Sequence, residues 1–143
     1  MKVLSIYGAA AWSLIFGVLH SLWASGFYIL LSADEAEKAF SRPAFFIYNF
    51  AVIIICIIGF LLALMQSDII QTQVRKPVIR FFGLCIAALL TLRGLAGMIH
   101  VLYLVVFDNR TLSIMSLWDL WFCLGGFLYY LNTKTRRRQT VMF

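Results

Sequence analysis

Four histidine or charged residues lie well inside stretches of the chain that are otherwise apolar. They are His20, Arg93, His100 and Asp119. A charge or an imidazole at membrane depth is energetically costly, so such residues by default indicate a site that binds a ligand or transfers protons. Arg93 is effectively always protonated, and Asp119 is the one acid within these stretches. We predict a compensated network in which Asp119 pairs with Arg93, directly or through water, or with His100.

Two kinds of metal site could use the same residues. Histidines on separate helices are typical axial ligands of haem, so His20 and His100 would serve a haem if they faced each other at one depth. No cofactor is predicted, and haem stays an alternative. A non-haem metal site is less favoured because Asp119 is its one available carboxylate. The same network would also serve to fix helix register without any chemistry, and no catalytic residue is assigned.

Four apolar stretches must position these residues. Each has the roughly 20 apolar residues that cross a bilayer, and in lipid each must be a helix because unpaired backbone groups are not tolerated there. The predicted fold class is all-α, a polytopic membrane four-helix bundle, forming a single transmembrane domain over 1–143. The spans are about 5–31, 44–65, 78–107 and 112–131.

Composition and charge distribution give the expected environment and orientation. The chain of 143 residues is 63% hydrophobic and 13% charged, whereas a soluble domain has roughly 25% charged residues. Eight basic residues lie on the side of both termini and three on the other side. Cytoplasmic loops carry an excess of Lys and Arg. We therefore predict that both termini are cytoplasmic and that the protein resides in the cell inner (cytoplasmic) membrane.

The polar residues fall at related depths in this topology. With a rise of about 1.5 Å per residue, His20, Asn49, His100 and Asp119 lie in the outer half of the bundle. Arg93 lies deeper, seven residues before His100 and so on nearly the same helix face. The predicted ligand site or polar network consists of His20, Trp23, Asn49, Arg93, His100 and Asp119.

The cysteines and the basic tail exclude two function classes. Cys56, Cys85 and Cys123 lie in three different spans and form no CxxC pair. Disulfide-exchange enzymes need paired thiols near an aqueous edge, so we predict no disulfide. The basic residues of 134–138 directly follow an apolar span, so we interpret them as a membrane anchor and expect no nucleic-acid partner.

Three short motifs carry a family resemblance. They are His20-Ser-Leu-Trp23, Leu92-Arg93-Gly94-Leu95-Ala96-Gly97, and Trp118-Asp119 followed by Cys123-Leu-Gly125. In this order they resemble an uncharacterised bacterial family of small four-helix integral membrane proteins, a domain of unknown function. Phe122 stands where that family usually has a proline. The resemblance implies a fold and a membrane location over nearly the whole chain, and it implies no activity.

The sequence favours a non-enzymatic accessory subunit or a small-ligand-binding module with a polar intramembrane site. The alternatives are a haem- or lipid-dependent membrane enzyme and a minimal dimeric transporter. The expected partners are the lipid bilayer and either a second copy of the chain or a larger membrane complex.

Overall fold

The computed structural model describes residues 2–27, 29–31, 33–107 and 115–139. In this part of the chain all regular secondary structure is helical, which confirms the all-α prediction. The helices are α1 (Lys2–Ala24), α2 (Ala33–Phe40), α3 (Pro43–Gln66), α4 (Lys76–Phe107) and α5 (Met115–Gln139). Pro43 begins α3, where its missing N–H costs nothing because the first N–H groups of a helix have no intrahelical acceptor.

The first predicted span extends too far. It was expected to reach Leu31, but α1 ends at Ala24. The Phe27 N–H bonds to the Leu22 carbonyl at 3.0 Å and the Gly26 N–H to the Trp23 carbonyl at 3.1 Å. These are the two bonds of a Schellman cap, and Gly26 has the positive φ of 87° that this cap requires. The apolar residues after the cap extended the hydropathy signal without extending the helix.

Two further boundaries differ from the prediction. The fourth span was expected to end at Leu131, but α5 continues to Gln139. Lys and Arg lower the hydropathy of 132–139 while remaining good helix formers, so polarity does not end the helix. The predicted start of this span, 112–114, lies outside the described residues. The connection 32–43 was expected to be a loop, yet it contains α2.

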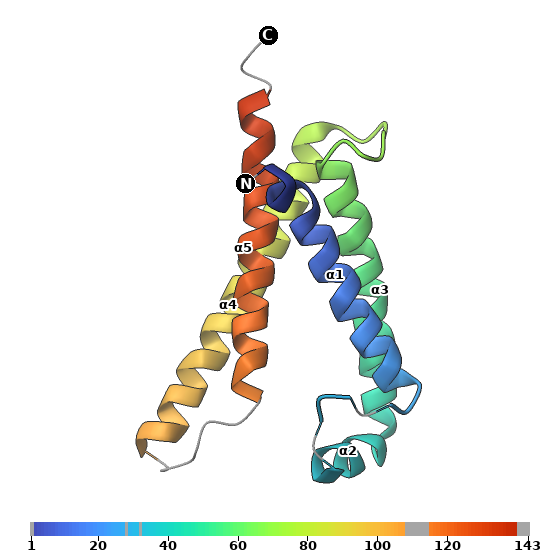
Figure 1. Cartoon of the computed structure of the whole chain (residues 1–143), viewed down its shortest axis with the longest axis vertical. Helices are drawn as coiled ribbons and strands as arrows, with labels where there is room; N and C mark the ends of the chain where they lie inside the picture. The colour runs from blue at the N-terminus through green and yellow to red at the C-terminus, as the bar shows by residue number, and fades with distance from the viewer. Residues whose placement is uncertain (1, 28, 32, 108–114, 140–143) are drawn as a thin grey trace.

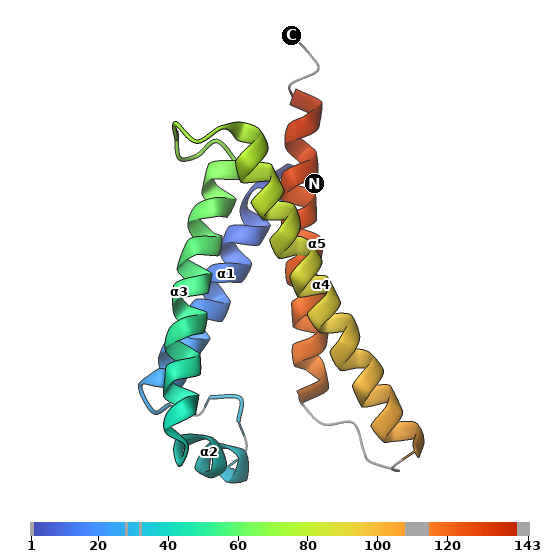
Figure 2. The same ribbon diagram turned by 180° about the vertical axis from the view of Figure 1, so that it is seen from behind.

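The helices form two pairs that spread apart toward one end of the molecule. α1 packs along α3, α4 packs along α5, and α1 also contacts α5. Figure 1 shows the pairs close together at the end where α5 terminates and the α3–α4 connection lies, and separated at the end that carries α2. The reverse view in Figure 2 shows the same divergence between α3 and α4.

Side chains of α1 and α5 join the two pairs. Trp12 Nε1 donates a hydrogen bond to the Trp121 carbonyl at 3.0 Å, and the hydroxyls of Ser13 and Tyr129 are 2.7 Å apart. A β-carbon at Gly125 would overlap the Trp12 ring, so a glycine is needed there for the indole to lie against α5. Hydrogen bonds and close packing therefore fix the pairs to each other away from the diverging end.

Polar and apolar residues are distributed in an unusual way. The described buried set includes many polar side chains, namely Ser13, His20, Asn49, Gln66, Asp119, Asn132 and Thr133. Large apolar side chains are exposed on all four long helices, for example Val18, Ile55, Leu92 and Phe127. By length and composition alone, two of the described helices, α3 and α4, are long and apolar enough to cross a membrane.

Candidate ligand-binding cleft

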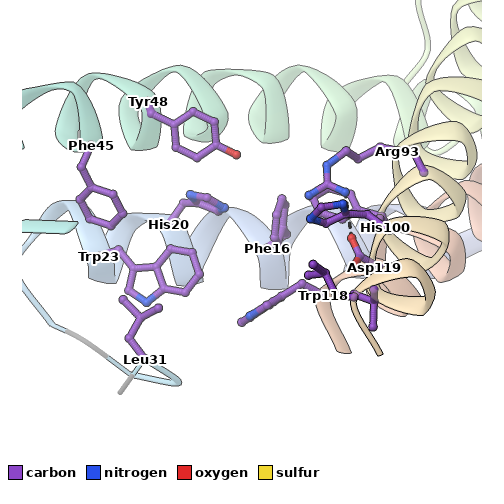
Figure 3. Close-up of a pocket in the computed structure, with 15 residues that line it drawn as sticks. Phe16, His20, Trp23, Leu31, Phe45, Tyr48, Arg93, His100, Trp118 and Asp119 are labelled. Atoms are coloured by element: carbon purple, nitrogen blue, oxygen red, sulfur yellow. Dashed lines mark hydrogen bonds and ion pairs between the residues drawn. The ribbon is translucent and has the colours of Figure 1, made fainter. Parts of the chain in front are cut away.

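A cleft of about 760 Å³ lies between the two helix pairs, in the half of the molecule where they diverge. Figure 3 shows side chains from both pairs pointing toward it. Its described lining consists of Phe16, His20, Trp23, Leu31, Phe45, Tyr48, Arg93, Ala96, Gly97, His100, Val101, Leu104, Trp118, Asp119 and Phe122. Five of the six residues predicted as a site therefore line one cavity, and the sixth, Asn49, is buried and bonded to His20.

Arg93 and Asp119 form the ion pair that the sequence predicts. Arg93 Nη1 donates to Asp119 Oδ1 at 2.8 Å, so the contact is direct. The Asp119 side chain is 9% exposed, whereas that of Arg93 is 57% exposed. The Arg93 guanidinium also lies 5.0 Å from the centre of the Phe122 ring, at cation–π distance. Among the described residues no other acceptor bonds to this guanidinium, so its remaining N–H groups are available to a ligand.

Glycines on α4 allow the ion pair to form. A β-carbon at Gly97 would overlap the Asp119 carboxylate, and one at Gly94 would lie 2.6 Å from the Asp119 carbonyl oxygen. Gly97 is four residues after Arg93, so the two residues share a helix face. Because Gly97 has no side chain, the Asp119 carboxylate has room to lie against α4 and to accept the hydrogen bond from Arg93.

Asn49 fixes His20 on the opposite side of the cleft. His20 Nδ1 and Asn49 Oδ1 are 2.6 Å apart, and Asn49 Nδ2 donates to the Phe45 carbonyl at 2.8 Å. Because that carbonyl accepts only, the amide must present its NH₂ to Phe45 and its oxygen to His20. His20 Nδ1 therefore carries a proton, and in the neutral ring Nε2 is an acceptor to which no described residue donates.

Aromatic side chains enclose the His20 ring. Its centre is 4.5 Å from that of Phe16, 4.8 Å from Trp23 and 5.8 Å from Tyr48, and all three contacts are edge-to-face. Trp23 in turn contacts Trp118 of the other pair at 5.6 Å. Of this aromatic wall, Trp23 was among the predicted site residues and Phe16, Tyr48 and Trp118 were not. Phe16 carried a usable signal, since a residue four positions before His20 lies on the same helix face.

The second histidine does not take Asp119 as its partner. His100 is exposed and lines the cleft from α4, on the same side as Arg93. Within the described part of the chain, no three His, Cys, Asp or Glu side chains are grouped to hold a metal ion. Cys56, Cys85 and Cys123 are free thiols on three different helices. The cleft thus contains one ion pair, two histidines and an aromatic wall.

The chain was compared with protein-family models, curated proteins and solved structures, and none of them matches it. The resemblance to a bacterial membrane family therefore stays a prediction, and the function must be argued from the cleft itself.

Proposed function

We propose that this chain is an integral membrane protein whose four long helices all cross the bilayer and whose cleft binds a small membrane-soluble ligand. The polar interior and apolar exterior support the membrane part of the proposal. In water, large apolar side chains such as Ile47, Leu89 and Ile99 would be buried, yet each is more than 60% exposed. Lipid is the solvent in which this distribution is favourable.

The geometry is compatible with four crossings. α1 has 23 residues and α5 has 25, and at about 1.5 Å per residue each is longer than the hydrocarbon core of roughly 30 Å. The basic residues Arg75, Lys76, Arg80 and Lys134 belong to the end where the pairs converge. The positive-inside rule then assigns that end to the cytoplasm, and the cleft faces the outer half of the membrane.

The cleft is the observation that carries the ligand-binding part. Its walls are largely apolar and aromatic, and they surround a few polar groups that converge from both helix pairs. This combination is typical of small-molecule sites. We assign the protein to a non-enzymatic binding role, either alone or as an accessory subunit, because the described lining residues form no nucleophile–base pair.

Filling the cleft tests this function. Ala96 lines the cleft and Ala88 does not, and both are exposed alanines of α4. Native mass spectrometry of the full chain released from mild detergent should find a small molecule bound to the wild type and to Ala88→Trp, and none bound to Ala96→Trp. Equal retention by both variants, or no bound molecule in any of them, would refute the proposal.

Topology is tested separately. A fluorescent reporter fused to the C-terminus should be active in the cytoplasm, and an alkaline phosphatase fused at the same place should be inactive. Strong phosphatase activity would contradict the assigned orientation.

A haem is the second candidate, because His20 and His100 line the cleft from different helix pairs. The His20–Asn49 hydrogen bond also leaves Nε2 free and fixes the orientation of the ring, as hydrogen bonds to metal-bound imidazoles do. A Soret band in the purified protein that disappears in His20→Gln would favour haem, and colourless protein after expression with excess haem would exclude it.

A further inference from the structure

We propose that the ligand is an uncharged lipid with a planar, oxygen-bearing head, of the quinone class, and that Asp119 excludes anionic lipids. This inference rests on the ligand-binding function proposed above. It follows from the charge of the cleft, from its hydrogen-bonding groups and from the shape of its walls.

The charge of the cleft favours a neutral ligand. Arg93 is the one Lys or Arg among the described lining residues, and Asp119 is the one acid. Because they are in direct contact at 2.8 Å, the pair is already neutral. A carboxylate or phosphate head would place a second negative charge beside the carboxylate of Asp119, which is 9% exposed, and like charges at this range repel. The remaining titratable lining groups, His20, His100 and Tyr48, carry no permanent charge.

The hydrogen-bonding groups match an oxygen-bearing head. On α4, the guanidinium N–H groups of Arg93 that Asp119 does not use are donors for a carbonyl oxygen. On α1, Nε2 of His20 is an acceptor, because Nδ1 carries the proton and donates a hydrogen bond to Asn49 Oδ1. A carbonyl oxygen on the ligand head would accept a hydrogen bond from Arg93. A head that also carries a hydroxyl group at its other end would in addition donate a hydrogen bond to Nε2 of His20.

The walls match a planar ring with an apolar tail. The ring planes of His20 and Trp23 are inclined at 73° to each other, and those of Trp23 and Trp118 at 75°. All three side chains line the cleft. Aromatic contacts of this kind favour a flat, polarisable head over a flexible alkyl chain. Leu31, Val101 and Leu104 continue the lining with apolar side chains, which suit a hydrocarbon tail.

The experiment compares three probes with the same decyl chain on the full-length protein in lipid nanodiscs. They are a ubiquinone analogue, decanol and decyl phosphate. Quenching of tryptophan fluorescence follows binding because Trp23 and Trp118 border the cleft, and native mass spectrometry gives the stoichiometry. We expect saturable one-to-one binding of the quinone analogue, with decanol and decyl phosphate each binding at least tenfold more weakly.

Charge variants separate the contributions of the two residues. Asp119→Asn leaves Arg93 uncompensated, so decyl phosphate should gain at least tenfold in affinity. Arg93→Gln combined with Asp119→Asn keeps the cleft neutral and removes the charged donor. A hydrogen bond to a charged group is stronger than one between neutral groups, so quinone affinity should fall at least tenfold in the double variant. Arg80→Gln, on α4 outside the cleft, should change neither affinity.

Each other outcome has a definite meaning. If decyl phosphate binds the wild type as tightly as the quinone analogue, the neutral-head inference is overturned while ligand binding stands. If decanol binds equally well, the planar head is overturned. If no probe binds saturably and Ala96→Trp behaves as the wild type, the proposed function itself fails. Should Asp119→Asn not fold, the probe series on the wild type and the double variant decides the question.

Discussion

Breaking the Arg93–Asp119 pair should destabilise the protein, and a double-mutant cycle measures by how much. The variants are Arg93→Leu, Asp119→Asn and their combination. Losing one partner of a fully buried ion pair costs about 3–5 kcal/mol, but the Arg93 side chain is 57% exposed to the cleft. Its charge is therefore partly solvated when alone. With one charge-assisted bond of 2.8 Å, we expect a coupling free energy of about 1.5–3 kcal/mol.

The assay is reversible unfolding in mixed micelles by titration with sodium dodecyl sulfate, followed by tryptophan fluorescence. The pair Asp68–Lys76 is a matched control, since its charges are 3.9 Å apart and its side chains are 55% and 72% exposed. Exposed ion pairs are worth about 0–1 kcal/mol, so the same cycle there should give a much smaller coupling. Additivity of the Arg93 and Asp119 variants within about 0.5 kcal/mol would refute the reasoning.

Three further predictions follow from the helix contacts. Gly97→Ala should reproduce most of the destabilisation seen in Asp119→Asn, because its β-carbon overlaps the carboxylate; an unfolding midpoint equal to the wild type would contradict the close approach. Ser13→Ala should cost about 1–3 kcal/mol by leaving the buried Tyr129 hydroxyl without its 2.7 Å partner, and the loss should be absent when Tyr129 is already Phe. Cys56 is buried and should be the slowest of the three thiols to react with N-ethylmaleimide; mass mapping that finds it modified first would disprove this.

The sequence predicts the site better than it predicts the helix ends. Arg93 and Asp119 could be paired from sequence because an intramembrane cation needs compensation and one acid was available. Asn49 could be included because its depth in the second span matches that of His20, His100 and Asp119. The hydrogen bonds that Arg93 donates to Asp119 and His20 donates to Asn49 agree with these predictions.

The remaining features depend on information that hydropathy does not contain. The end of α1 is set by the positive φ of Gly26, while the apolar residues after Gly26 keep the hydropathy as high as within the helix. The extension of α5 past Leu131 follows from helix propensity instead of polarity. Trp118 and Phe122 of α5 contact Trp23 and Phe16 of α1, across the two helix pairs. No spacing rule within one helix predicts such a contact.

The attachment between the helix pairs has a mechanical consequence. Away from the diverging end, hydrogen bonds such as Ser13–Tyr129 join the two pairs. Beside the cleft, α1 and α5 contact each other through aromatic rings such as Trp23 and Trp118. A helix of 24 residues such as α3 acts as a lever of roughly 36 Å. A rotation of about 5° at the joined end therefore moves its far end by about 3 Å. The width of the cleft is thus sensitive to small angular changes at a distant joint, while the packing inside each pair stays the same.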